Sequence, residues 1–242
     1  MPISGTRHLS IGGGVARAIK FQPDANCVLW TPGQDDPQSA VLRDRSGQVN
    51  NGAITSATWV RSDKGLWCLS FDGTDDVVSF PAKDYSATNG TIEFWMNPQE
   101  WTDYPCIIDD WPIGTSPTNY FLFIRHGSAD ANEGKLQFTI NDGGGEDSAF
   151  STTTPIVGTW YHIVGTWGAA GMVLYLDGVA EGTNANTGEW TPTEVLTIGT
   201  FVLDQAIRYY QGYLALLRIY SRALPLSEVQ SHYRQERALV GA

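Results

Sequence analysis

The chain has 242 residues, of which 17% are charged and 12% aromatic, and its formal net charge is −11 at pH 7. A hydrophobic fraction of 42% can fill a core, which excludes a disordered chain, and no run approaches the roughly 18 apolar residues of a membrane span. The surplus of acidic side chains repels phosphate, so we expect no nucleic-acid partner.

The N-terminal residues differ in character from the rest of the chain. Residues 1–8 contain no apolar stretch of a secretion signal, so we expect synthesis in the cytoplasm without a signal peptide. Residues 12–14 are all glycine and predict a hinge, and residues 15–22 alternate apolar and polar side chains as a strand does. We expect residues 1–26 to form an arm that pairs with its own sheet or reaches a neighbouring subunit, and residues 27–242 to form one domain.

Short runs rich in β-branched and aromatic residues occupy most of that domain, separated by Gly, Pro, Asn or Asp clusters. The runs predicted as strands are residues 76–80, 91–96, 120–125, 135–140, 161–166, 172–176, 195–199 and 213–220. Asp177 and Gly178 predict a two-residue hairpin turn, and residues 141–145 (NDGGG) predict a longer hairpin loop. Many short strands with regular turns indicate an all-β sandwich or jelly roll.

One helix is predicted near the C-terminal end of the sequence. Pro225 can open its first turn, and Leu226, Val229 and Tyr233 then form one apolar stripe. The side chains expected on its polar face are Glu228, Gln230, Arg234, Gln235 and Glu236. We therefore expect a terminal helix that packs on the sandwich through the stripe.

The three cysteines, Cys27, Cys68 and Cys106, have long and unrelated spacings. They match neither a zinc site nor a disulfide framework. We expect reduced, mostly buried thiols.

Six short motifs follow one another between residues 44 and 229. They are DRSG at 44–47 with NG at 51–52 and ATW at 57–59, LSFDGTDDVV at 69–78, TIEFWMNP at 91–98, GTWYHI at 158–163, LYLDG at 174–178, and the segment from Gly212 through RIYSRAL at 218–224 to Glu228 and Val229. Together they resemble the laminin G-like, concanavalin A-like jelly-roll family over roughly residues 28–235. The resemblance implies one jelly-roll β-sandwich with the N-terminal arm and the short C-terminal helix added.

Several motif residues have structural interpretations. The strand residues expected to fill the core between the sheets are Phe94, Trp95, Trp160 and Tyr175. We expect Arg218 to anchor to a carboxylate or to loop carbonyls. His162 lies in the middle of a strand, where a satisfied structural histidine is expected.

The family that the chain resembles consists mostly of binding and adhesion modules for sugars or proteins, often with a structural calcium ion, and some relatives by fold are glycoside hydrolases. Such a fold does not determine function. The family's I-D-E-V segment reads LALL here, at residues 214–217. The two carboxylates of that segment, one of which serves the calcium site in many relatives, are therefore missing at this position.

Catalysis by a glycoside hydrolase would need two carboxylates that face one cleft. Glu93 stands alone in its strand, and the adjacent Asp109 and Asp110 would point to opposite faces of an extended strand. No motif surrounds any of the four histidines. No catalytic residue is therefore predicted.

Binding of a sugar uses an aromatic face for its C–H surface and Asp or Asn side chains for its hydroxyls. Loops that combine these groups supply the candidate ligand-binding residues Trp101, Asp103, Tyr104, Asp109, Trp111, Asn141, Asp142 and Trp190. The alternative is that the tryptophan rings only cap the sandwich.

Clustered carboxylate oxygens suit calcium, the one cofactor expected. The candidate metal ligands are Asp72, Asp75 and Asp76, and a second acidic set is Asp142, Glu146 and Asp147. Solvated turns are the alternative for both sets.

These observations lead us to expect a non-catalytic, lectin-like binding or adhesion module whose partner is a carbohydrate or a protein surface. The arm, the missing signal and the reduced cysteines favour a homo-oligomer or a larger assembly, such as a decoration, fibre or tail protein on a viral or phage particle. The alternatives are a polysaccharide-active hydrolase or lyase and a purely structural coat component without ligand.

Overall fold

The computed structural model describes residues 21–33, 38–82, 85, 88–101, 104–110, 120–127, 129–186, 195–200, 202–203 and 206–242. Most of the arm expected at residues 1–26 lies outside this part of the chain. Residues 21 and 22, the described end of the strand predicted at 15–22, are not in a strand.

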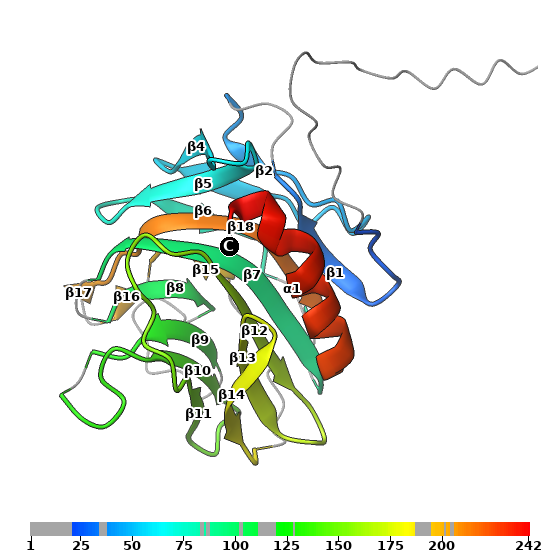
Figure 1. Cartoon of the computed structure of the whole chain (residues 1–242), viewed down its shortest axis with the longest axis vertical. Helices are drawn as coiled ribbons and strands as arrows, with labels where there is room; N and C mark the ends of the chain where they lie inside the picture. Colours follow the sequence, from blue (N-terminus) through cyan, green and yellow to red (C-terminus); the bar gives the residue numbers. More distant parts are fainter. Residues whose placement is uncertain are drawn as a thin grey trace, which may run out of the picture.

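Two eight-stranded antiparallel sheets make up the sandwich (Figure 1). Sheet A contains, in spatial order, β14 (Val179–Asn184), β13 (Met172–Leu176), β12 (Tyr161–Trp167), β7 (Gly90–Glu100), β18 (Gln211–Tyr220), β5 (Trp67–Asp72) and β4 (Thr58–Arg61), with β1 (Cys27–Thr31) paired to β18. Sheet B contains β11 (Glu146–Phe150), β10 (Leu136–Asn141), β9 (Tyr120–Arg125), β8 (Cys106–Asp109), β15 (Thr197–Ile198), β6 (Val77–Ser79), β3 (Gly52–Thr55) and β2 (Val41–Leu42).

The remaining elements are a short hairpin and one helix. The hairpin joins β16 (Val202–Leu203) to β17 (Ala206–Ile207), and α1 (Leu226–Val240) covers the outer face of sheet A (Figure 1). The predicted all-β sandwich with a C-terminal helix is confirmed, and each run predicted within residues 27–242 contains a strand. Asp177 and Gly178 form the predicted turn between β13 and β14, with φ values of 50° and 78°.

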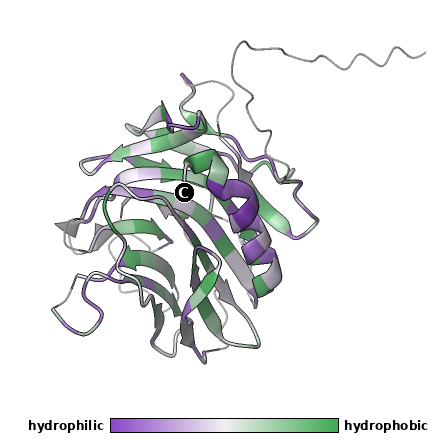
Figure 2. Cartoon of the chain, viewed as in Figure 1, coloured by the Kyte–Doolittle hydropathy of each residue, from purple (hydrophilic) through white to green (hydrophobic). Residues whose placement is uncertain are grey.

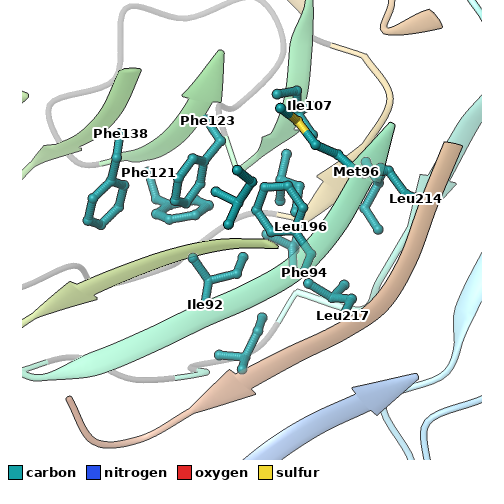
Figure 3. Packing of buried hydrophobic residues seen from close by; sticks show 14 of the residues in the cluster. Ile92, Phe94, Met96, Ile107, Phe121, Phe123, Phe138, Leu196, Leu214 and Leu217 are labelled. Carbon is teal, nitrogen blue, oxygen red and sulfur yellow. The ribbon is translucent and has the colours of Figure 1, made fainter. Parts of the chain in front are cut away.

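The main apolar core lies between the two sheets and is rich in aromatic rings (Figure 3). Phe94 of β7 meets Phe123 of β9 edge-on with ring centroids 5.4 Å apart, and Phe123 stacks on Phe138 of β10 at 4.7 Å. Gly165 of β12 is required at this contact, because a Cβ atom there would lie 2.6 Å from the Phe123 ring. The expected inward position of Phe94 is confirmed.

A second, smaller core lies on the other face of sheet A, beneath α1. Trp95 and Tyr175 are buried there with Val229 of the helix, and the half-buried Trp160 packs against the same cluster. The prediction that these three rings fill the space between the sheets is therefore wrong. Adjacent strand residues point to opposite faces, so Trp95 must face outward once Phe94 faces inward.

The buried side of α1 differs from the predicted stripe. Val229 is fully buried and Tyr233 half-buried, but Leu226 in the first turn is 44% exposed. Glu236, expected on the polar face, is only 3% exposed and faces sheet A. Figure 2 shows hydrophilic residues along much of the helix. The inward side of α1 thus includes a carboxylate.

Glu236 is buried because it pairs with Arg218 of β18. Arg218 Nη1 also lies 3.0 Å from Glu93 Oε2, and Trp95 Nε1 donates to Glu236 Oε2 at 3.0 Å. The side chains of Arg218 and Glu93 have no solvent exposure. Of the two anchors expected for Arg218, a carboxylate or loop carbonyls, the structure shows a carboxylate, and two of them pair with it.

Two histidines complete what we call the Arg218 cluster, which consists of Arg218, Glu93, Glu236, His162 and His232. His162 Nε2 lies 2.7 Å from Glu93 Oε1, and His232 Nδ1 lies 3.0 Å from both Glu93 oxygens. Burial alone would raise the pKa of Glu93, but the Arg218 charge and the histidine hydrogen bonds hold that pKa well below its usual value. His162 is thus a buried structural residue, although its Nδ1 has no hydrogen-bond partner among the described residues.

The three cysteines are free and buried, as expected. Burial raises the pKa of the Cys27 and Cys68 thiols to about 12, so both remain protonated at neutral pH. In the part of the chain that the structure describes, no helix has the length and apolar character needed to cross a membrane.

We expect Arg218→Met to lower the free energy of unfolding by about 3–5 kcal/mol, because it leaves two buried carboxylates without a cation. Urea denaturation at pH 7 measures the change. Arg234→Met alters an exposed arginine of α1 and should change stability by less than about 0.5 kcal/mol. Equal stability of the two variants would contradict the role of Arg218.

Acid should weaken the fold through Glu93. A carboxylate whose pKa is lowered by folding contributes its full stabilisation above its unfolded pKa, about 4.3, and loses it as the pH falls toward the folded pKa. Urea denaturation from pH 7 to pH 3 should show this loss below about pH 4.3. The stability of Glu93→Gln should depend less steeply on pH in that range, and parallel curves for the two proteins would refute the assignment.

Candidate functional site

The outer face of sheet B carries a row of polar side chains. Thr139 of β10 pairs with Ser148 of β11, and Gln137 pairs with Phe150. Since alternate strand residues share a face, these four side chains all point away from the core. Gln137 Nε2 donates to Thr139 Oγ1 at 2.9 Å and to Ser148 Oγ at 3.0 Å. The row therefore has a fixed hydrogen-bond pattern.

His126 lies directly after β9 at one end of this row. Its Nδ1 is 2.9 Å from Gln137 Oε1, and its Nε2 is 3.0 Å from Asp130 Oδ2. The rings of Tyr104 and Phe150 meet the imidazole edge-on, with centroids 5.5 and 5.3 Å away. All three rings are half-buried. We call Tyr104, His126, Gln137, Ser148 and Phe150 the His126 face.

Three candidates from the sequence share the outer side of sheet B. Tyr104 belongs to the His126 face, with the Arg208 guanidinium 4.6 Å above its ring. Asn141, at the end of β10, pairs with Glu146 of β11. Asp109 is 2% exposed, and its carboxylate accepts hydrogen bonds from Thr197 Oγ1 at 2.8 Å and Cys106 Sγ at 3.2 Å. Asp109 is therefore engaged within the protein.

The remaining candidates do not join this group. Trp101 is half-buried against the inter-sheet core, and its Nε1 donates to the Pro155 carbonyl at 3.0 Å. Asp142 is exposed at the tip of the β10–β11 hairpin and accepts the Gly144 amide at 2.9 Å. The other three candidates, Asp103, Trp111 and Trp190, lie outside the described residues.

The predicted metal ligands Asp72, Asp75 and Asp76 do come together. Their carboxylate oxygens lie within 4.8 Å of one another in the loop between β5 and β6. Asp76 is 5% exposed, and its Oδ2 accepts the Asp72 amide at 2.6 Å. Burial and the two neighbouring carboxylates raise the pKa of Asp76. Three carboxylates are hard oxygen donors of the kind that calcium prefers, so the residues fit this ion.

The second acidic set behaves differently. Among the described residues, Asp142, Glu146 and Asp147 do not form such a group. Glu146 accepts a hydrogen bond from the Tyr120 hydroxyl, and Asp147 Oδ2 accepts one from Asn186 Nδ2 at 2.5 Å. These carboxylates therefore serve local contacts.

Two groups of residues were not found from the sequence. The polar alternation of Gln137, Thr139 and Asn141 in β10 was a usable signal for the His126 face. For the Arg218 cluster, the signal was Glu93 itself, a charge within an apolar strand, because such a charge needs a buried partner. Its partners lie in β12, β18 and α1, and His232 is 139 residues away.

Comparison with known proteins agrees with this fold. The model of the concanavalin A-like lectin/glucanase superfamily matches residues 72–230, more than half of the chain, so the chain belongs to this family. The resemblance noted in the sequence is confirmed. A search of curated proteins gives no match.

Several solved structures share the architecture. Domain 4 of AbnA, a GH43 extracellular arabinanase from Geobacillus stearothermophilus, solved with arabinotriose, is 15% identical with a TM-score of 0.67, over 86% of this chain and 98% of that one. The binding domain of Paraclostridial Mosquitocidal Protein 1 is 14% identical with a TM-score of 0.67, over 86% and 52%. A mutant Trypanosoma rangeli sialidase displaying trans-sialidase activity is 15% identical with a TM-score of 0.64, over 91% and 34%. At these identities the similarity establishes the fold.

The calcium expectation leads to a direct test. A cation that binds only the folded state stabilises it by mass action, so calcium should raise the melting temperature relative to EDTA. Asp75→Asn should reduce this increase, because it removes one of the three clustered carboxylates. The matched control is Asp142→Asn in another exposed turn. Identical melting curves with calcium and with EDTA would contradict the expectation.

Proposed function

We propose that this chain is a non-catalytic carbohydrate-binding module and that a glycan binds on the His126 face. The observation that carries the proposal is the grouping of two half-buried aromatic rings, Tyr104 and Phe150, around His126 and the Gln137–Ser148 hydrogen bond. Rings of this kind can contact the C–H surface of a sugar, and amide and hydroxyl groups can pair with its hydroxyls.

The buried carboxylates Glu93, Glu236 and Asp109 support a non-catalytic role. A glycosidase acid needs a raised pKa and a partner carboxylate facing the same bond. Glu93 and Glu236 are close together, but both pair with Arg218, and the pKa of Glu93 is lowered. Asp109 is held by Thr197 and Cys106. None of these groups is arranged as a general acid.

Arabinotriose is the first probe for this proposal, because the AbnA domain with the same fold was solved with it. We expect binding in calorimetry, or binding of another oligosaccharide on a glycan array. His126→Ala should weaken the affinity at least about tenfold, or about 1.4 kcal/mol, because it removes the imidazole that contacts both rings and holds Gln137.

Gln48→Ala, in an exposed loop, is the control and should bind as the unaltered protein does. Both variants are checked by thermal melting, so that a folding defect is not mistaken for lost binding. The proposal fails if no oligosaccharide binds, or if His126→Ala binds normally. Release of reducing sugar ends from a polysaccharide would favour the hydrolase alternative.

We further propose that the chain forms a homo-oligomer through residues 1–26. The base of this arm is fixed to the domain, since the Phe21 ring packs 4.8 Å from Trp30 and Asp24 Oδ2 lies 2.8 Å from Arg222 Nη2. Light scattering should give an oligomer for the full chain and a monomer after removal of residues 1–20. A monomeric full chain would contradict this part of the proposal.

A further inference from the structure

A pocket of about 270 Å³ lies between α1 and the segment that precedes β1. Phe21 and Gln22 contribute one side, Tyr220 of β18 lies at the sheet, and Ser231, His232 and Gln235 contribute the helical side. The volume is just below the range of about 300–1,000 Å³ typical of drug-sized ligands, so the pocket suits one ring-sized group. It lies on the sheet A side of the sandwich, whereas the His126 face belongs to sheet B. We call it the α1 pocket.

The charges at the α1 pocket disfavour an ionic ligand. Asp24 and Glu228 line it, and Arg222 bridges them, with Nη2 2.8 Å from Asp24 Oδ2 and 2.6 Å from Glu228 Oε1. Two carboxylates against one guanidinium leave a negative balance that repels anions. A cationic ligand would have to compete with Arg222, which already holds both carboxylates. A neutral ligand faces neither obstacle.

His232 presents a hydrogen-bond acceptor to this pocket. Its Nδ1 faces both oxygens of Glu93 at 3.0 Å, and because a carboxylate only accepts, Nδ1 must carry a proton. In the neutral imidazole the other nitrogen, Nε2, is then an acceptor. Nε2 makes no hydrogen bond within the described part of the chain, and His232 lines the pocket. The side chain is 12% exposed.

Tyr220 adds an unused donor beside it. The residue is 1% exposed, and its hydroxyl has no hydrogen-bond partner among the described residues. Burial raises the pKa of Tyr220, so the hydroxyl stays protonated. Leaving a buried polar group unpaired costs about 1–3 kcal/mol. A ligand group that pairs with this hydroxyl would therefore recover that cost.

We propose that the α1 pocket binds one neutral sugar residue, as a second carbohydrate site distinct from the His126 face. A sugar ring supplies hydroxyls that can donate to His232 Nε2 and accept from Tyr220, and its C–H surface suits the half-buried Phe21 ring. Ser231 and Gln235 add groups that can both donate and accept. This second site is independent of the proposed function, because the α1 pocket would bind a monosaccharide even if no glycan binds on the His126 face.

The test uses the full chain labelled with ¹⁵N and titrated with D-glucose, D-galactose, D-mannose and L-arabinose to about 50 mM, which detects even a Kd above 1 mM. At least one of these sugars should shift the amide signals of Ser231, His232 and Gln235. D-glucuronate, an anion, should shift them much less. Absence of shifts with all four neutral sugars, or equal shifts with glucuronate, would overturn the proposal.

Two matched variants locate the site. Ser231→Trp places a large side chain into the α1 pocket and should raise the Kd at least about tenfold. Arg234→Trp adds the same side chain at an exposed position of α1 and should leave the Kd within about twofold. Unchanged binding by Ser231→Trp would overturn the proposal. If Ser231→Trp does not fold, Gln235→Ala at the exposed rim replaces it and should weaken binding at least about threefold.

The experiment also separates this pocket from the proposed function. His126→Ala should remove oligosaccharide binding on sheet B and leave the Ser231 and Gln235 shifts unchanged. If His126→Ala abolishes the Ser231 and Gln235 shifts as well, the α1 pocket is not an independent site. If arabinotriose fails to bind sheet B but the monosaccharide shifts at α1 persist, only the proposed function fails.

Discussion

Arg218 carries a positive charge at a position without solvent exposure, and such a charge is stable only when opposite charges surround it. Glu93 of β7 and Glu236 of α1 supply those charges, and the two histidines satisfy the remaining lone pairs of Glu93. The pairing joins the two central strands of sheet A to the terminal helix. It explains why α1 buries a carboxylate, why Trp95 finds a partner for its ring nitrogen, and why His232 is held at the edge of a pocket.

The two outer faces of the sandwich consequently differ. The helix covers part of sheet A, and on that side a pocket lies in the gap between α1 and the segment before β1. Sheet B instead carries the polar row that ends at His126. The same fold carries a domain of an arabinanase, a toxin binding domain and part of a sialidase. Because a fold of this kind supports many functions, the function proposed here depends on the side chains of these faces.

Much of the fold could be predicted from residue pattern alone. Apolar and aromatic runs such as those of β7, β12 and β18 were found because central strands bury both faces and are therefore mostly apolar. Several strands lay outside the predicted runs, among them β5 and β8 inside their sheets and β11 and β14 at the sheet edges. The predicted hairpin turns implied β11 and β14 without giving their bounds. An edge strand is partly solvated, so its sequence (EDSAF in β11, VAEGTN in β14) has little apolar alternation to detect. The turn at Asp177 and Gly178 was predicted because it depends only on local backbone conformation.

The sequence by itself therefore determined the sandwich, its hairpins, the terminal helix and the unpaired cysteines, and it indicated that Arg218 needs an acceptor partner. The candidate metal ligands Asp72, Asp75 and Asp76 could be found from the sequence because they lie within five consecutive residues. Only the tertiary structure decided which side of β7 faces the main core, and so placed Trp95 under the helix. The tertiary structure also showed that Glu93 pairs with His232, which is 139 residues away in the sequence. Strand alternation defines two faces but does not say which is inside, and contacts between distant segments follow from the packing of the whole chain.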